Sequence, residues 1–149
     1  MMKKRFIPVA LGALMVLSLA GCGGSKAVTY KDGTYEGKSS VYEGDEEGNG
    51  DGYGVVTLTL SGGKITDCQF LTYQPDGTLK DEEYGKQNGE VANADFYNKA
   101  QRAVLASHGY GEKLAETGDI TKVDAVSGAT ISYKEFKEAV DNALAEAAQ

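Results

Sequence analysis

The chain has few of the residues that build metal centres and disulfides. Its 149 residues include two cysteines, Cys22 and Cys68, and a single histidine, His108. Zinc sites draw their ligands mainly from these residue types, so a lone histidine with no cysteine cluster near it argues against one. We expect His108 to be an exposed imidazole at the end of a helix. Cys68 lies in an apolar strand pattern, which favours a small buried hydrophobic residue.

Basic residues are also scarce, with 15 Lys and Arg against 22 Asp and Glu. This balance argues against a nucleic-acid partner, because a phosphate backbone is bound by a positive surface. Residues 45–56 faintly resemble a calcium loop, but Val56 stands where such a loop needs a bidentate glutamate. A solvated acidic loop is therefore favoured, and no metal site is expected. The sequence also lacks a P-loop and a recognisable nucleophile–base pair, so the chemistry that these motifs carry is poorly supported.

The apolar run near the N-terminus is too short to cross a bilayer. Residues 6–17 are mostly apolar, basic residues 3–5 precede them, and Leu-Ala-Gly-Cys closes the run at residues 19–22. This organisation predicts a signal peptide. Its ending resembles the lipobox of bacterial lipoproteins, which implies cleavage before Cys22 and lipidation of that cysteine. The alternative is a plain secretory signal with an incidental cysteine.

These signals divide the chain into a signal peptide (residues 1–21), a lipidated tether (residues 22–29) and one folded domain (residues 30–149). Cleavage removes three of the 15 basic residues and no acidic one, which leaves a net charge of about −10. Cys68 is then the only cysteine besides Cys22, so no intrachain disulfide is expected. The acidic surface offers no polybasic membrane patch, and attachment to the extracytoplasmic face of the cell membrane must come from the lipid.

Hydrophobic patterning predicts an α+β domain, a small antiparallel sheet with helices packed on one side. The expected elements are a strand at 34–42, a strand at 53–60, a turn at 61–63, a return strand at 64–73, a turn at 74–77, a helix capped by Asn93 and stopped by Gly109, a short helix at 110–116 and a strand at 121–126. A capping box with Ser132 at the N-cap and Glu135 three residues later begins the last helix. Its apolar face comprises Phe136, Ala139, Val140, Ala143, Leu144 and Ala147.

Residues 124–130, Asp-Ala-Val-Ser-Gly-Ala-Thr, stand directly before that helix. Thr130 is thus expected just ahead of a helix N-terminus, where unpaired N–H groups and the helix dipole favour a phosphate. Gly128 can adopt a positive φ, and together with the small Ala129 it permits close approach of another molecule. A threonine hydroxyl held at this place is a reasonable phosphoryl acceptor.

Three segments resemble the FMN-binding domain family of single-domain lipoproteins, namely residues 32–37, 53–67 and 123–130. The last resembles the flavin-attachment motif and is the specific one. The resemblance implies that a Mg²⁺-dependent flavin transferase moves FMN from FAD onto Thr130, so the chain is a substrate of an enzyme and not itself an enzyme. It also implies that Asp124, Ser127, Gly128 and Ala129 form the motif that the transferase recognises. Asp124, being acidic, is expected to accept backbone N–H bonds and fix the turn.

The function implied is electron transport, with covalent FMN relaying electrons from a membrane quinol-linked donor to an extracytoplasmic acceptor. Related domains often carry a Glu-Thr pair after the second hairpin strand, and here Asp76 and Thr78 are the candidates to replace it. Stacking on the flavin ring is considered for three aromatic residues, Tyr53, Tyr73 and Tyr133. The alternative is an unflavinylated lipoprotein that binds a ligand or serves as a surface antigen.

Overall fold

The computed structural model describes residues 28–46 and 49–149, so the predicted signal peptide, Cys22 and most of the tether lie outside the described residues. The described elements are β1 (Gly33–Lys38), β2 (Tyr53–Ser61), β3 (Lys64–Tyr73), α1 (Ala94–Thr117), the 3₁₀ turn η1 (Ile120–Lys122) and α2 (Thr130–Ala147). No helix among these residues is long and apolar enough to span a membrane.

The three strands form an antiparallel sheet in the order β1-β2-β3. The hairpin between β2 and β3 is confirmed, because Gly62 and Gly63 both adopt a positive φ (61° and 72°), which a non-glycine residue rarely tolerates. The first strand is shorter than predicted and ends at Lys38. Beyond it, Tyr42 pairs with Gly52 in an isolated bridge rather than in a continuing strand.

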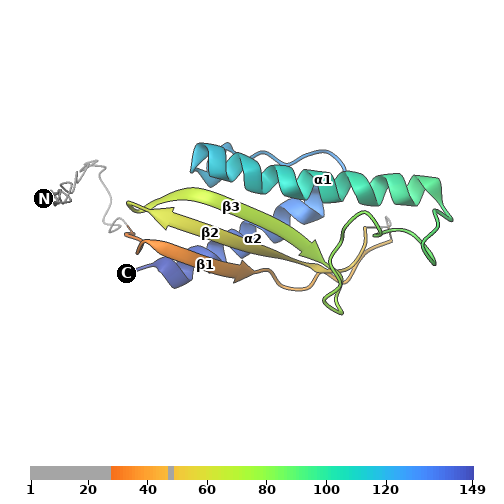
Figure 1. Ribbon diagram of the computed structural model, residues 1–149, viewed down its shortest axis with the longest axis horizontal. Coiled ribbons are helices and arrows are strands. Elements are labelled where there is room, and N and C mark those ends of the chain that lie inside the picture. Colours follow the sequence, from red (N-terminus) through yellow and green to blue (C-terminus); the bar gives the residue numbers. More distant parts are fainter. Residues whose placement is uncertain (1–27, 47–48) are drawn as a thin grey trace, which may run out of the picture.

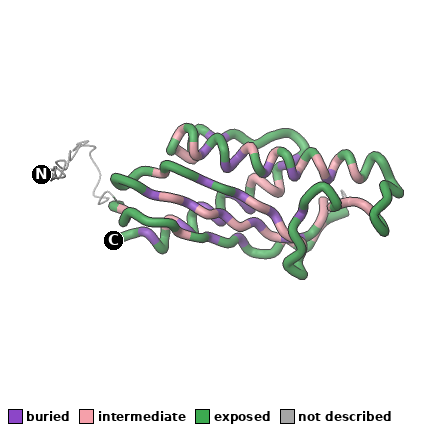
Figure 2. The backbone as a smooth tube through the Cα atoms, viewed as in Figure 1, coloured by how far each residue is buried: buried purple, intermediate pink, exposed green. Residues whose placement is uncertain are grey.

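Both helices cover the same face of this sheet. The buried positions of β2 alternate, and the side chains of Val56 and Leu58 join one core with residues of both helices. Helix α1 packs on β3, whereas α2 packs on β1 and β2 (Figure 1). The buried residues run along the layer between sheet and helices (Figure 2). The expected α+β fold with helices on one side is therefore confirmed. Four of the six predicted α2 face residues are fully buried alanine or valine, and Phe136 is fully buried as well.

Helix α1 begins as predicted but ends much later. The Asn93 side chain accepts a hydrogen bond from the Phe96 N–H group (3.0 Å), which is the expected N-cap. The helix then continues through Gly109 to Thr117, and Gly118 is the left-handed C-cap (φ 65°). Gly111 explains the continuation, because a Cβ there would lie 2.9 Å from the Phe70 nitrogen of β3. The glycine thus serves close helix–sheet packing and does not break the helix.

The region before α2 also differs from the prediction. Residues 121–126 form no strand, since the Asp119 side chain accepts hydrogen bonds from the N–H group and hydroxyl of Thr121 and closes the η1 turn. Helix α2 begins at Thr130, two residues before the predicted Ser132 cap. Its N-cap is Ala129, which makes no side-chain cap bond. Ser132 therefore lies inside the first turn, and the predicted capping box does not form.

Candidate functional site

The loop that precedes α2 is held by a buried tyrosine of α1. The Tyr110 hydroxyl accepts a hydrogen bond from the Val126 N–H group (2.9 Å) and donates one to the Ala129 carbonyl (3.1 Å). Its ring is 2 % exposed and packs against the rings of Tyr133 and Phe136. These contacts bury Ala129 and place the start of α2, which explains why the helix begins there without a side-chain cap.

The prediction that Asp124 fixes this turn is wrong. Asp124 is exposed, and its side chain forms no hydrogen bond with a residue that the structure describes. The sequence reasoning missed Tyr110 because it ended the helix at Gly109. Ser107, Gly111 and Leu114 follow Val104 at helical spacing and are all buried. This spacing indicates that the helix continues past Gly109 and would have placed Tyr110 within it.

Tyr110→Phe is expected to loosen this loop and to lower the free energy of unfolding by about 1–3 kcal/mol. The substitution keeps the ring but leaves the Val126 N–H group and one lone pair of the Ala129 carbonyl without their partner. Hydrogen exchange at Val126 should accelerate, as measured by NMR, and exchange in β2 should accelerate by no more than the loss of global stability accounts for. An unchanged rate at Val126 would contradict the assigned role.

The structure leaves most of the motif accessible. Ser127, Gly128 and Thr130 are exposed, whereas Ala129 is 4 % exposed and points into the core. Gly128 has the predicted positive φ (83°), and a Cβ there would meet nothing within 4 Å. Open space therefore surrounds this turn. Thr130 is the first residue of α2, so its hydroxyl stands beside the unpaired N–H groups of the first helical turn.

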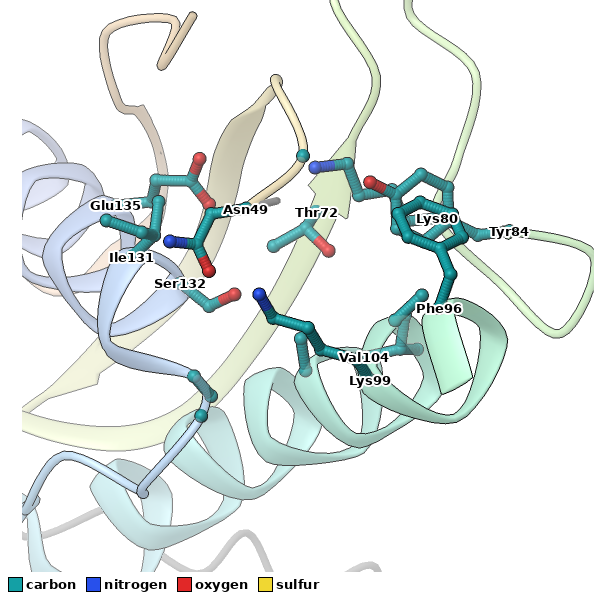
Figure 3. A pocket seen from close by; sticks show the side chains of 15 residues that line it. Asn49, Thr72, Lys80, Tyr84, Phe96, Lys99, Val104, Ile131, Ser132 and Glu135 are labelled. Carbon is teal, nitrogen blue, oxygen red and sulfur yellow. The ribbon is translucent and has the colours of Figure 1, made fainter. Parts of the chain in front are cut away.

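A pocket opens directly beside the motif, between the first turns of α1 and α2 and the end of β3 (Figure 3). Its enclosed space is about 50 Å³, which is below the range of small-molecule sites, and the value rises to about 570 Å³ only when the open space at its mouth is included. Apolar side chains form much of its wall. The lining side chains are Phe96, Ala100, Ala103, Val104, Ala129 and Ile131 on the apolar side, and Asn49, Thr72, Lys80, Tyr84, Lys99, Ser132 and Glu135 on the polar side.

Two of these polar side chains are charged types buried in the pocket wall. Glu135 is 5 % exposed and Lys80 is 8 % exposed. Burial raises the pKa of the Glu135 carboxyl to about 7, against the opposing attraction of Lys80. Burial likewise lowers the pKa of Lys80, against the charges of Glu135 and Asp51. The sequence reasoning used Glu135 only as part of a capping box and did not single out Lys80, because no local pattern marks their meeting.

A second hollow lies on the other side of the motif turn. Ser127 and Gly128 form one wall of it, and Lys99 and Arg102 of α1 contribute to the other together with Asp95 and Asn98. Lys99 lines both hollows. Two cations therefore lie close to the turn that leads into Thr130, in a chain whose overall charge is negative. Cations beside a helix N-terminus make this the region of the motif most favourable for an anion.

Several residues considered for other roles lie away from this pocket. Tyr53 and Tyr73 stack on each other (ring centroids 5.5 Å apart), on the sheet face turned away from the helices. The Tyr133 hydroxyl donates to the Val123 carbonyl (2.7 Å). Asp76 accepts from the Thr78 N–H group (2.9 Å) within the turn after β3. None of these side chains lines the pocket beside the motif.

Cys68 and His108 were considered for thiol and metal chemistry, and the structure gives neither of them a special environment. Cys68 is buried as predicted, and burial raises the pKa of its thiol to about 12. His108 is exposed as predicted, although it lies within α1 and not at its end. No group of three or more potential metal ligands occurs among the described residues.

Known proteins resemble both the sequence and the fold. Residues 48–145, which include the motif and the pocket, match the model of the FMN-binding domain. The chain belongs to the FMN-binding domain family. A similar solved structure is the CPE2226 protein from Clostridium perfringens, with a TM-score of 0.55, 20% identity, and coverage of 80% of this chain and 89% of that one. At this identity the likeness concerns the fold. No curated protein matches the chain.

This FMN-binding domain has a pocket whose chemistry fits a flavin mononucleotide. Its apolar walls suit an aromatic ring system, and the buried Glu135 Oε1 atom has no hydrogen-bond partner among the described residues. The cations Lys99 and Arg102 beside the motif suit a phosphate. The family membership supports a flavin-binding protein with a redox role.

Proposed function

We propose that this chain is a membrane-anchored, extracytoplasmic electron carrier that holds FMN through a phosphoester to Thr130. The observation that carries the proposal is the position of Thr130, which is the exposed first residue of α2. Its neighbours Gly128 and Ala129 line the partly apolar pocket, and Ser127 and Gly128 line the hollow that contains Lys99 and Arg102. The family match over residues 48–145 includes this position. The chain is then the substrate of a flavin transferase and not itself an enzyme.

Thr130 supplies the attachment chemistry. Its hydroxyl oxygen forms the new bond to the FMN phosphorus, the bond between that phosphorus and the AMP part of FAD breaks, and the hydroxyl proton leaves. The first-turn N–H groups of α2 are free of side-chain caps and can bind the resulting phosphodiester. Lys99 and Arg102 balance its negative charge from the facing helix.

The pocket supplies the environment of the ring. Phe96, Val104 and Ile131 offer apolar contacts and exclude water from one side, while Ser132 and Thr72 offer hydroxyl groups. FMN, when bound, supplies one- and two-electron redox chemistry, and the protein supplies orientation and tuning. Covalent attachment suits a carrier outside the cell, where a dissociated flavin would be lost.

The proposed location rests on the N-terminal sequence. Lipidation of Cys22 would leave a tether of seven residues, 23–29, which spans at most about 25 Å when extended. The domain would therefore stay close to the membrane, within reach of a quinol-linked donor. The strongly acidic surface supports lipid-mediated rather than electrostatic attachment to the bilayer.

Thr130→Ala is expected to abolish covalent flavin completely. The chain would be produced together with a flavin transferase, and intact mass and visible absorbance would be measured after denaturation. The wild type should gain the mass of one FMN moiety and keep its yellow colour, and Thr130→Ala should show neither. Thr121→Ala removes the same atoms from another exposed threonine of this region and should be labelled fully.

An unlabelled wild type, with a known acceptor domain labelled in parallel, would reject the covalent proposal. It would favour a lipoprotein that binds its ligand without a covalent bond. Labelling of Thr130→Ala at the wild-type level would instead place the attachment on another residue.

A further inference from the structure

Glu135 and Lys80 form an incomplete polar site inside the pocket. Both are more than nine-tenths buried, and the Glu135 Oε1 atom has no hydrogen-bond partner among the described residues. Neither side chain belongs to an ion pair within 4.0 Å in the described part of the chain. Figure 3 shows the Glu135 carboxyl and the Lys80 ammonium pointing toward each other from opposite sides of the pocket. A buried acceptor and a buried donor that do not satisfy each other leave room for a molecule that satisfies both.

The surrounding backbone holds these two side chains in place. Glu135 lies in the second turn of α2 opposite Gly54, where an added Cβ would come 3.3 Å from the Glu135 Cβ atom. Lys80 is anchored by the hydrogen bond from its N–H group to the Thr72 carbonyl (2.9 Å). Its Nζ atom lies where a Cβ on Gly52 would come within 2.6 Å, and it also lies 4.9 Å from the centre of the Tyr84 ring. Two glycines thus admit the two charged side chains.

We propose that Glu135 and Lys80 recognise the imide edge of a planar heterocycle, in which an N–H group stands between two carbonyl groups. The Glu135 carboxylate accepts from the imide N–H, and the Lys80 ammonium donates to an adjacent carbonyl. This inference rests on the proposed function, under which the ligand is the flavin and the edge is that of its pyrimidine ring. The motif at residues 124–130 includes neither residue.

The position of the pair agrees with attachment at Thr130. Glu135 follows Thr130 by five residues in the same helix, which corresponds to a rise of ~7.5 Å along its axis. A ring tethered through a flexible chain to Thr130 therefore reaches the Glu135 end of the pocket. The apolar residues Phe96, Val104 and Ile131 then lie beside the rest of the ring. Lys80 would place a positive charge next to the edge that becomes electron-rich on reduction, which tunes the flavin toward a higher potential.

Free riboflavin and 3-methylriboflavin test this assignment without covalent attachment. The full chain, made without a transferase and kept in detergent, would be titrated with each compound, and binding would be followed by flavin fluorescence. The methyl group removes the imide N–H, so the wild type should bind 3-methylriboflavin at least roughly tenfold more weakly than riboflavin.

Three variants assign the contacts. Glu135→Met should bind riboflavin at least roughly tenfold more weakly and should lose the discrimination against the methyl compound. Glu135→Gln keeps an acceptor oxygen and should retain part of the discrimination against 3-methylriboflavin. Lys80→Met should weaken binding of both compounds and keep the discrimination, because the N–H contact belongs to Glu135. Glu146→Met, exposed on the same helix, is the matched control and should behave as the wild type.

Removal of a buried carboxylate that lacks a partner should not unfold the chain, and a thermal melt of Glu135→Met verifies this. No measurable riboflavin binding by the wild type, or equal binding of both compounds, would overturn the inference. Wild-type discrimination in a correctly folded Glu135→Met would overturn it as well. These results are independent of the mass experiment on Thr130, so the edge contact and the covalent bond can fail separately.

Discussion

Gly37→Ala is expected to lower the free energy of unfolding by about 3 kcal/mol or more. Gly37 of β1 is the point where α2 touches the sheet most closely. A Cβ there would collide with the Ala139 carbonyl oxygen and would lie 2.5 Å from the Ala143 nitrogen. Both obstacles are helix backbone, which cannot rotate away as a flexible side chain can. The substitution must therefore push α2 off the sheet or distort β1.

Urea denaturation of Gly37→Ala and of a control variant, Gly109→Ala, checks this expectation. Gly109→Ala is the matched control, because Gly109 is helical and a Cβ there meets nothing within 4 Å. It should raise the free energy of unfolding by about 0.5–1 kcal/mol, since alanine favours a helix. If the free energy of unfolding of Gly37→Ala lay within about 1 kcal/mol of the wild-type value, α2 would be able to shift and admit the Cβ at little cost. Because α2 carries Thr130 and Glu135, flavin loading should fall together with stability.

Glu135→Gln is expected to make the chain more stable at pH 8 than the wild type, by ~1–3 kcal/mol. In the folded chain burial raises the pKa of Glu135 from 4.5 to about 7. The folded state therefore keeps a proton between these values that the unfolded state has lost. The contribution of this proton on Glu135 to the free energy of unfolding is complete below about pH 4.5 and disappears as the pH rises through about 7. The wild type should thus lose stability from pH 5 to pH 8.

Comparing the wild type with Glu135→Gln from pH 5 to pH 8 isolates the effect of the Glu135 titration on stability. Lys80 and Glu138 act on Glu135, Tyr84 and Lys99 share its pocket, and Asp51 acts on Lys80 and Tyr84. They remain in both chains, so the difference between the two urea midpoints should be near zero at pH 5 and grow toward pH 8. Parallel pH profiles would mean that Glu135 does not titrate in this range. The measurement uses the unloaded chain, because a bound ligand would alter the environment of the carboxyl.

Much of the sheet could be predicted from short segments. The β-branched residues of β2, the Gly62-Gly63 turn and the bounds of β3 all follow from patterns a few residues long, as does the Asn93 cap. The motif at residues 124–130 was recognisable for the same reason, because attachment motifs are read locally. The helical face of α2 was also visible in its spacing, and its burial agrees with that pattern.

Three of the errors have one physical origin, which is that contacts between distant segments outweighed local preference. Gly109 reads as a helix stop, but packing of Gly111 on β3 carries α1 eight residues further. Ser132 reads as an N-cap, but the Tyr110 hydroxyl holds Ala129 and starts α2 earlier. Asp124 reads as the residue that fixes the turn, and the same tyrosine takes that role.

The sequence by itself determined the fold class, the hairpin, the start of α1 and the presence of a helix next to the motif, since each depends on neighbours along the chain. The tertiary structure alone decided where α1 ends and α2 begins, and it alone brought Lys80 and Glu135 into one pocket. The reason is that helix ends and buried charges depend on which backbone and side-chain groups lie opposite them. Those partners come from distant segments, and packing of both helices on the same sheet face selects them.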